Sequence, residues 1–289
     1  MKSWIRLLRP HQWVKNGFVL APLVFSGRAV EPAAVLAAAA AFLAFCALAS
    51  GVYALNDVFD READREHPTK HRRPVAAGEI RVRDAALGGG ILVAAGLVAM
   101  AAVDPAVGAV GAVYLVLNGL YNVRLKEVVL VDVFAVGAFF VLRLLAGSAA
   151  IDVTPSVWLL VCGGLLALYL GFAKRRYELH LLGEDSHRHR GVLAEYSSVL
   201  LDQISVVLLA VTVVAYLMYT VSSETAEAVG ADALAYSVVF ILYGVFRHLF
   251  LVHEHDRGSP TETLLTDPAL VGTVLLWILY CGWILYGPL

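Results

Sequence analysis

The sequence has few charged residues. Only 16% of its 289 residues are Asp, Glu, Lys or Arg, whereas 60% are hydrophobic, and runs of about twenty residues without a charge recur along the chain. Such runs exclude an ordinary water-soluble domain and are typical of membrane-spanning helices. The chain also lacks a Pro/Ser-rich linker, so we expect one helical domain over residues 1–289.

Cysteine is scarce, and soluble-type nucleotide-binding fingerprints are missing. The three cysteines lie singly in apolar segments, which indicates neither a disulfide framework nor a zinc site. The glycine run "LGGGIL" at 87–92 lies inside an apolar span, so it is not a nucleotide-binding loop of the soluble type. We also expect no nucleic-acid partner. The basic, aromatic N-terminal segment is expected to lie at the membrane interface. His253–Asp256 ("HEHD") is only a weak metal candidate.

Apolar windows predict an all-α integral membrane protein with nine transmembrane helices. The predicted spans are 13–27, 33–56, 84–103, 106–122, 128–149, 155–173, 197–221, 233–252 and 268–287. Nearly all Lys and Arg residues fall in the connections on one side of this layout. The positive-inside rule therefore predicts a cytoplasmic N-terminus, a C-terminus on the opposite side, and cytoplasmic loops at about 59–82 and 175–195 that cap the active site.

Polar oxygens gather where the second span meets the cytoplasm. At about 100° per residue, Asn56, Asp57, Asp60 and Asp64 share one helix face. Three carboxylates and an amide on one stripe can hold one or two Mg²⁺ ions, because Mg²⁺ prefers hard oxygen ligands shared with substrate phosphates. We therefore expect these four residues to be both metal ligands and catalytic residues.

The alternative is a solvated helix end whose acids pair with Arg61, Arg65 and Lys70. Pro68 and Pro74 end the helix and leave a basic loop. This loop can fold over the acids, so that its cations bind phosphate. Its candidate phosphate-binding residues are Lys70, Arg72 and Arg73.

These segments resemble a known family. "NDVFDREAD" (56–64) has the N-D-x-x-D-x-x-x-D form of the UbiA superfamily of membrane prenyltransferases, and "HPTKHRRPVAAG" (67–78) resembles its basic loop. The resemblance covers essentially the whole chain, including the nine-helix plan. Four further segments resemble the decaprenyl-phosphate phosphoribosyltransferase branch: "RPHQWVKNGFVLAPL", "YNVRLKEVVLVDVF", "GFAKRRYEL" and "EYSSVLLDQ". The resemblance to this branch implies Mg²⁺-dependent transfer of phosphoribose from phosphoribosyl diphosphate to a polyprenyl phosphate.

A second polar cluster follows the sixth span. Superfamily members with aromatic acceptors usually carry a D-x-x-x-D motif here, but this sequence has "AKRRYELHLLGEDSHRHRG". Lys174 and Glu178 are one turn apart on one face, and Arg175 lies beside them. Such cations suit a donor with a 5-phosphate as well as a diphosphate. Arg188 and Arg190 are equally explained as positive-inside charge.

The fifth span contributes further ionisable residues. Lys126 precedes it and Asp132 lies one turn inside, so both are candidate catalytic residues, and Tyr121 is a candidate substrate-binding residue. Arg143 lies in mid-span, where a charge must face the bundle interior. Either it forms a structural ion pair with a neighbouring helix or it faces the substrate.

Near the N-terminus, Lys15 and Asn16, with Arg9 and Gln12, either meet the lipid phosphate or anchor the chain at the interface. We expect a cell-membrane enzyme with its active site facing the cytoplasm. The rival interpretations are a prenyltransferase that uses an allylic diphosphate and an aromatic or lipid acceptor, and a transporter with intramembrane charges. An evident inverted repeat is lacking, which counts against transport.

Overall fold

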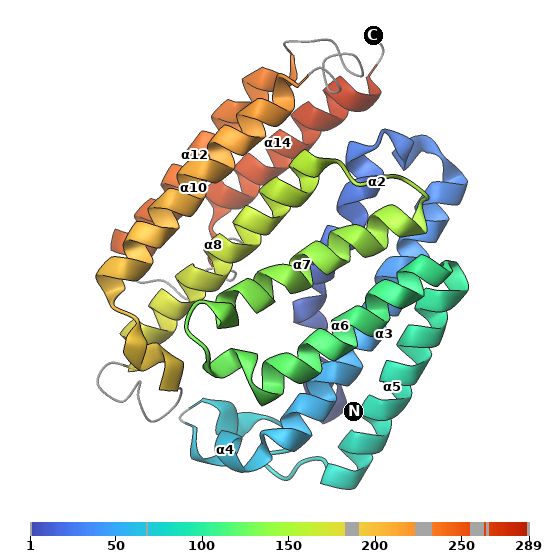
Figure 1. Ribbon diagram of the computed structural model, residues 1–289, viewed down its shortest axis with the longest axis vertical. Helices are drawn as coiled ribbons and strands as arrows, with labels where there is room; N and C mark the ends of the chain where they lie inside the picture. The colour runs from blue at the N-terminus through green and yellow to red at the C-terminus, as the bar shows by residue number, and fades with distance from the viewer. Residues whose placement is uncertain are drawn as a thin grey trace. The chain divides into compact units, whose positions relative to one another are not determined.

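The computed structural model describes residues 2–67, 69–182, 191–222, 233–254, 263 and 266–287. All regular elements in these ranges are helical, and eight segments are long and apolar enough to cross a membrane (Figure 1). The long helices are α3 (Pro32–Phe59), α5 (Val82–Val103), α6 (Pro105–Val123), α7 (Val131–Ala150), α8 (Val157–Leu182), α10 (Ser198–Thr220), α12 (Val238–Glu254, preceded by η7, Leu234–Ser237) and α14 (Pro268–Tyr286). They correspond to the second through ninth predicted spans.

The first predicted span, 13–27, forms no long α-helix. The N-terminal elements are α1 (Lys2–Leu8), the 3₁₀ helix η1 (Pro10–Leu20), α2 (Ala21–Phe25) and η2 (Arg28–Val30). Pro22 contributes to this break, because proline has no N–H to continue the hydrogen-bond ladder. A 3₁₀ helix rises about 2.0 Å per residue, so η1 extends over roughly 22 Å despite its shortness.

This N-terminal segment follows α3 along much of its length. Trp13 Nε1 donates a hydrogen bond to Ser50 Oγ over 3.0 Å, near the later half of α3. Leu23 packs with Ala34 and Ala38, at the beginning of α3. The segment is therefore extended enough to accompany a transmembrane helix, and the count of nine spans stays a prediction.

Contacts divide the chain into two compact units. Unit 1 consists of Met1–Lys126 and Phe139–Pro155, and unit 2 of Glu127–Ala138 and Ser156–Leu289. Helix α7 thus contributes its first residues to unit 2 and its remainder to unit 1. The expectation of one domain across residues 1–289 stays a prediction.

Glycine brings α3 and α5 together in unit 1. A Cβ atom on Gly51 would lie 2.7 Å from the Gly89 carbonyl oxygen, and one on Gly96 would lie 2.6 Å from the Leu48 nitrogen. Close backbone approach of this kind is typical of helix pairs in membranes. Within the glycine run of the third predicted span, Gly89 is explained by this packing, whereas a Cβ atom on Gly90 would meet nothing within 4 Å.

In unit 2, α8 packs against α10. Phe172 and Leu201 share one buried cluster, and Tyr169 and Leu209 share the next one along the two helices. Helix α8 runs on to Leu182, beyond the predicted end of its span at 173, so it carries the second polar cluster on regular helix. The short η6 (Gly191–Glu195) then precedes α10.

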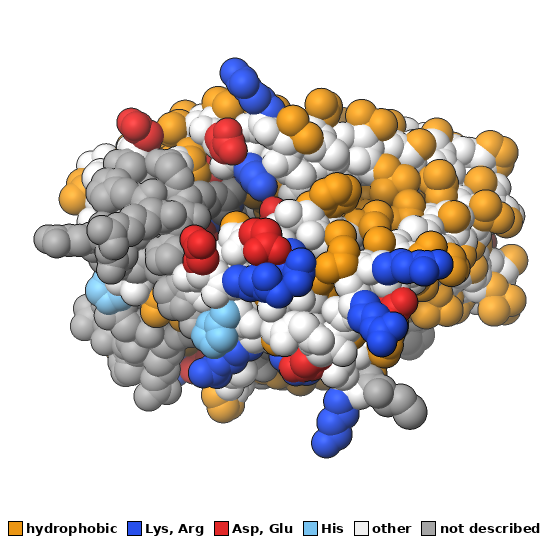
Figure 2. Space-filling view, turned by 90° about the horizontal axis from the view of Figure 1, so that it is seen from below, with side chains coloured by type: hydrophobic (Ala, Val, Ile, Leu, Met, Phe, Trp, Pro, Cys, Tyr) orange, Lys and Arg blue, Asp and Glu red, His pale blue; other side chains and the backbone are white. Residues whose placement is uncertain are grey.

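Charged side chains of both signs gather on the face drawn in Figure 2, beside a surface covered by hydrophobic side chains. The elements α4 (Arg61–Glu66) and η3 (Lys70–Arg72) of unit 1 supply part of this charge. Charged segments beside an apolar surface are expected of a protein whose helices are embedded in a bilayer.

Candidate functional site

The predicted stripe keeps its helical repeat across the end of α3. The helix ends at Phe59 and α4 begins at Arg61, but the Asp60 N–H bonds to the Asn56 carbonyl (2.9 Å) and the Asp64 N–H to the Asp60 carbonyl (2.8 Å). These bonds have α-helical spacing, so the four side chains stay on neighbouring turns. Asp57 and Asp64 are buried, whereas Asn56 and Asp60 are partly exposed.

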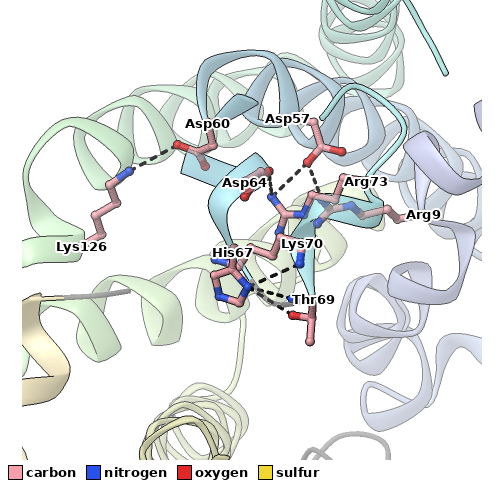
Figure 3. Close-up of polar contacts among 9 residues, drawn as sticks. All are labelled: Arg9, Asp57, Asp60, Asp64, His67, Thr69, Lys70, Arg73 and Lys126. Atoms are coloured by element: carbon pink, nitrogen blue, oxygen red, sulfur yellow. Dashed lines mark hydrogen bonds and ion pairs between the residues drawn. The ribbon is translucent and has the colours of Figure 1, made fainter. Parts of the chain in front are cut away.

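Two arginines lie against the buried acids (Figure 3). Arg73 from the basic loop places Nη1 2.7 Å from Asp64 Oδ2 and 3.2 Å from Asp57 Oδ1, and so bridges the two carboxylates. Arg9 places Nη2 2.5 Å from the same Asp57 oxygen. The loop thus returns over the acids as the sequence predicts, and a second guanidinium group arrives from the N-terminal segment.

Arg9 was expected only at the lipid interface, and its contact with Asp57 was missed. It lies between α1 and η1 with a left-handed backbone (φ 51°), and its guanidinium carbon is 5.3 Å from the centre of the Tyr53 ring. Burial lowers the pKa of Arg9, and the neighbouring Asp57 charge opposes this effect. A basic residue beside a proline was the only local signal for this turn.

The partly exposed members of the stripe bind helix α6 and the residues after it. Asn122 Nδ2 donates a hydrogen bond to Asn56 Oδ1 over 2.9 Å. Lys126 Nζ lies 3.6 Å from Asp60 Oδ1, which brings the predicted catalytic lysine to the acidic stripe. Asn122 was not among the predicted site residues, although it lies in the segment that carries Tyr121.

The alternative pairing of the acids with Arg61 and Arg65 does not occur. Both arginines instead lie against Glu62, at 3.1 and 3.3 Å respectively, away from the stripe. Lys70 and Arg72 are exposed at the surface of the loop. Of the predicted loop cations, Arg73 lies on the acids.

Hard oxygen donors at this position fit a magnesium ion. Asp57 Oδ2 is buried and has no hydrogen-bond partner, so one oxygen of this carboxylate is left for a further ligand. Carboxylate and amide oxygens are the ligands that Mg²⁺ prefers, usually with substrate phosphates and water. Within the described parts of the chain, no three His, Cys, Asp or Glu side chains converge as a ready-made metal cage.

Unit 2 carries a second buried polar network. Arg175 Nε lies 2.7 Å from Asp132 Oδ2, and the Tyr196 hydroxyl donates to Asp132 Oδ1 over 3.0 Å. The same hydroxyl accepts the Leu130 N–H over 2.6 Å, where the backbone is left-handed (φ 65°). The sequence predicts site roles for Asp132 and Arg175, but their contact and the role of Tyr196 were missed.

The exposed edge of this network contains the predicted Lys174–Glu178 pair. Lys174 Nζ lies 3.7 Å from Glu178 Oε1, and Arg175 Nη1 donates to Glu178 Oε2 over 2.7 Å. Glu178 therefore joins a buried arginine to an exposed lysine on one turn of α8. Arg188, Arg190, His255 and Asp256 lie outside the described residues.

Arg143 lies in the apolar core of unit 1. It is 3% exposed, its Nε donates to Asn16 Oδ1 over 2.8 Å, and its guanidinium carbon lies 4.9 Å from the Phe45 ring centre and 5.3 Å from that of Tyr114. The described residues place no carboxylate within ion-pair distance of Arg143. Of the two interpretations, the ion pair with a neighbouring helix therefore does not occur among them, and an amide and aromatic rings surround the guanidinium group.

The remaining predicted substrate-binding residues of unit 1 are Lys15, Asn16 and Tyr121. Asn16 is 1% exposed in the core, where its amide donates to Cys46 Sγ over 3.2 Å, so it is no surface residue. Lys15, beside it on η1, is half-buried. The Tyr121 ring packs edge-on against Phe139 with 5.9 Å between ring centres.

Known proteins resemble the chain over nearly its whole length. A model described as the UbiA prenyltransferase family matches residues 17–279. A protein of Mycolicibacterium smegmatis named decaprenyl-phosphate phosphoribosyltransferase is 33% identical and covers 98% of this chain and 92% of its own. A protein of Corynebacterium glutamicum with the same name is 32% identical and covers 95% and 84%. The structure of a UbiA homologue of Archaeoglobus fulgidus, bound to DMAPP and Mg²⁺, superposes with a TM-score of 0.71 at 20% identity, over 98% of this chain and 99% of that one.

Proposed function

Because this chain belongs to the UbiA prenyltransferase family, we propose that it transfers 5-phosphoribose from phosphoribosyl diphosphate to a polyprenyl phosphate of the decaprenyl type. The C1–O bond of the donor breaks, and its electron pair leaves with pyrophosphate. An oxygen of the lipid phosphate forms the new bond to C1. A phosphate is ionised at neutral pH, so no strong general base is required.

The observation that carries this proposal is the name shared by near-full-length relatives, 33% and 32% identical, together with the chemistry of the second polar cluster. That cluster contains Lys174, Arg175 and Glu178. Superfamily members with aromatic acceptors usually carry a second pair of aspartates at this place, which would serve another metal ion. Cations of this kind match the extra 5-phosphate of a phosphoribosyl donor. An allylic diphosphate has no such group.

In this proposal, Asp57 and Asp64 present oxygens to a metal, and Asn56 and Asp60 assist them from the neighbouring turns. Bound Mg²⁺ would stabilise the charge that develops on the departing diphosphate. Arg73 lies beside these acids and binds diphosphate oxygens, and Lys126 adds a positive charge at Asp60. Lys70 and Arg72 would take up phosphate at the outer edge of the loop, and Tyr121 and Lys15 would line the approach of the lipid.

The chain is a multi-pass membrane protein. We place it in the cell membrane with the stripe facing the cytoplasm, because a phosphorylated sugar is a cytosolic substrate and Lys and Arg concentrate at that end. The polyprenyl tail would stay in the hydrocarbon among apolar helix faces. This sidedness has its own test: a cysteine introduced at exposed Arg72 should react with an impermeant thiol reagent only after the cytoplasmic side is opened.

The second candidate is transfer of an isoprenyl chain from an allylic diphosphate, which the family name and the ligands of the Archaeoglobus fulgidus homologue favour. Purified protein in detergent should be incubated with polyprenyl phosphate and either phosphoribosyl diphosphate or geranyl diphosphate. Mass spectrometry should detect the phosphoribosylated lipid only with the sugar donor and only with Mg²⁺. A prenylated product alone would replace the proposal with the second candidate. Pyrophosphate release without an ion gradient would also exclude a transporter.

A further inference from the structure

Each carboxylate of the stripe already lies beside a cation. Asp57 Oδ1 is 2.5 Å from Arg9 Nη2 and 3.2 Å from Arg73 Nη1. Arg73 also lies 2.7 Å from Asp64, and Lys126 lies 3.6 Å from Asp60. Three acidic groups thus face three basic groups, and the formal charge of the cluster is balanced.

A metal ion and a guanidinium group compete for the same carboxylate lone pairs. Arg9 and Arg73 are 21% and 25% exposed in their side chains, so water screens them only partly from an ion placed between the acids. A divalent cation alone would therefore meet a carboxylate that two guanidinium groups already neutralise. A diphosphate relieves this conflict, because its oxygens accept the same planar fork of N–H groups.

We propose that Arg9 and Arg73 are exchangeable counter-ions of Asp57: they leave its carboxylate for the diphosphate when a metal takes their place. This inference rests on one part of the proposed function, namely that the substrate is a diphosphate bound together with a metal ion. The buried Asp57 Oδ2 without a partner is the oxygen at which the metal would first bind. Metal and diphosphate then raise each other's affinity, and this coupling is reciprocal.

The two arginines come from elements that are held together. Leu7 of α1, Val75 of the basic loop and Ile80, just after this loop, lie in one buried cluster. Arg6 forms an ion pair with Glu79 at 2.8 Å, and it also donates to the Arg72 carbonyl. The N-terminal helix and the loop therefore carry Arg9 and Arg73 as one assembly, which suits a joint transfer from carboxylate to diphosphate.

The affinity for Mn²⁺ tests this idea. It should be measured by electron paramagnetic resonance on the purified full chain, with and without inorganic pyrophosphate. Wild-type protein should bind Mn²⁺ about tenfold more tightly with saturating pyrophosphate, after correction for the complex formed in solution. Arg9→Gln should bind Mn²⁺ alone more tightly than wild type, bind pyrophosphate more weakly, and lose most of the coupling. Arg9→Lys keeps the charge without the fork, so it should bind Mn²⁺ alone like wild type and still bind pyrophosphate more weakly.

The matched control is Arg65→Gln, which removes a positive charge from α4 that faces Glu62 rather than the stripe. It should leave both affinities and their coupling unchanged. Unchanged or weaker Mn²⁺ binding by folded Arg9→Gln, or equal gains in both glutamine variants, would overturn the proposal. Pyrophosphate is common to sugar and isoprenyl donors, so the result does not depend on which one the enzyme uses. A failed product assay with intact coupling would reject only the phosphoribosyl donor.

Discussion

Arg175 Nε lies 2.7 Å from Asp132 Oδ2, and neither side chain is more than 3% exposed. This buried ion pair joins the beginning of α7 to the later part of α8. We propose that this end of α8 faces the cytoplasm. Arg175 Nη1 also donates to Glu178 Oε2, and the Tyr196 hydroxyl donates to Asp132 Oδ1. The pair therefore fixes the position of Glu178, which faces the exposed Lys174.

Breaking this pair on one side should destabilise the protein strongly. In Asp132→Ala, the Arg175 charge stays buried without its carboxylate, and the expected loss is about 3–5 kcal/mol. Thermal unfolding in detergent, followed by tryptophan fluorescence, measures it. Lys174→Gln is the control, because its 57% exposed side chain forms a solvent-screened pair that contributes less than about 1 kcal/mol. Equal melting temperatures for the two variants would contradict the buried pair.

Tyr196 predicts a specific pH dependence. Burial is the main cause that raises its pKa to about 12, above roughly 10 for an exposed tyrosine. The folded state thus holds this proton more tightly than the unfolded chain, so the contribution of Tyr196 is complete below about pH 10 and is lost as the pH rises towards 12. Tyr196→Phe should be about 1–2 kcal/mol less stable at pH 8, and the difference should shrink in alkali. A difference that grows above pH 10 would contradict the assignment.

Asn16 should matter because of Arg143. Asn16→Ala leaves Arg143 Nε, buried in the core, without its acceptor, and hydrogen bonds to charged groups contribute about 1.5–3 kcal/mol. Cys46→Ala removes the other partner of Asn16, a weak sulfur acceptor, and should cost clearly less. Unfolding midpoints of both variants, compared in the same detergent, decide this. A larger loss for Cys46→Ala would refute the Asn16–Arg143 contact.

Two glycines of α5, Gly96 and Gly90, provide a test position and a control position for the packing of α5 against α3. In Gly96→Ala, the new Cβ atom would lie 2.6 Å from the Leu48 nitrogen, so the helices must separate and the protein should lose on the order of 1–3 kcal/mol. Gly90→Ala has nothing within 4 Å and should be neutral or slightly stabilising. Cross-linking of cysteines placed across α3 and α5 would detect the separation independently.

The sequence predicts eight of the spans and the acidic stripe because both depend on local repeats. Hydropathy locates α3, and the 100° turn per residue places Asp57 and Asp64 on one face without any tertiary information. The return of the loop also follows locally, from its prolines and its run of positive charge. Arg73 therefore lies near its predicted partners.

Contacts between distant segments could not be predicted in this way. Arg9 reaches Asp57 across 48 positions, and Tyr196 reaches Asp132 across 64. Neither pair has a characteristic spacing, because each depends on how separate helices pack. The 3₁₀ form of η1 was missed for another reason: apolar windows measure hydrophobicity, and a 3₁₀ helix has the same composition as an α-helix while it rises further per residue.

The central claim is that the carboxylates of the stripe hold the metal ion that would stabilise the departing pyrophosphate. Comparing the activities of three variants tests this claim most directly. Pyrophosphate release from phosphoribosyl diphosphate, with polyprenyl phosphate and Mg²⁺ present, should be measured for Asp57→Asn, Asp64→Asn and Glu62→Gln. The first two should lose at least about 100-fold in rate, whereas Glu62→Gln, with its side chain 74% exposed, should keep wild-type activity. Wild-type turnover in folded Asp57→Asn and Asp64→Asn would contradict the account.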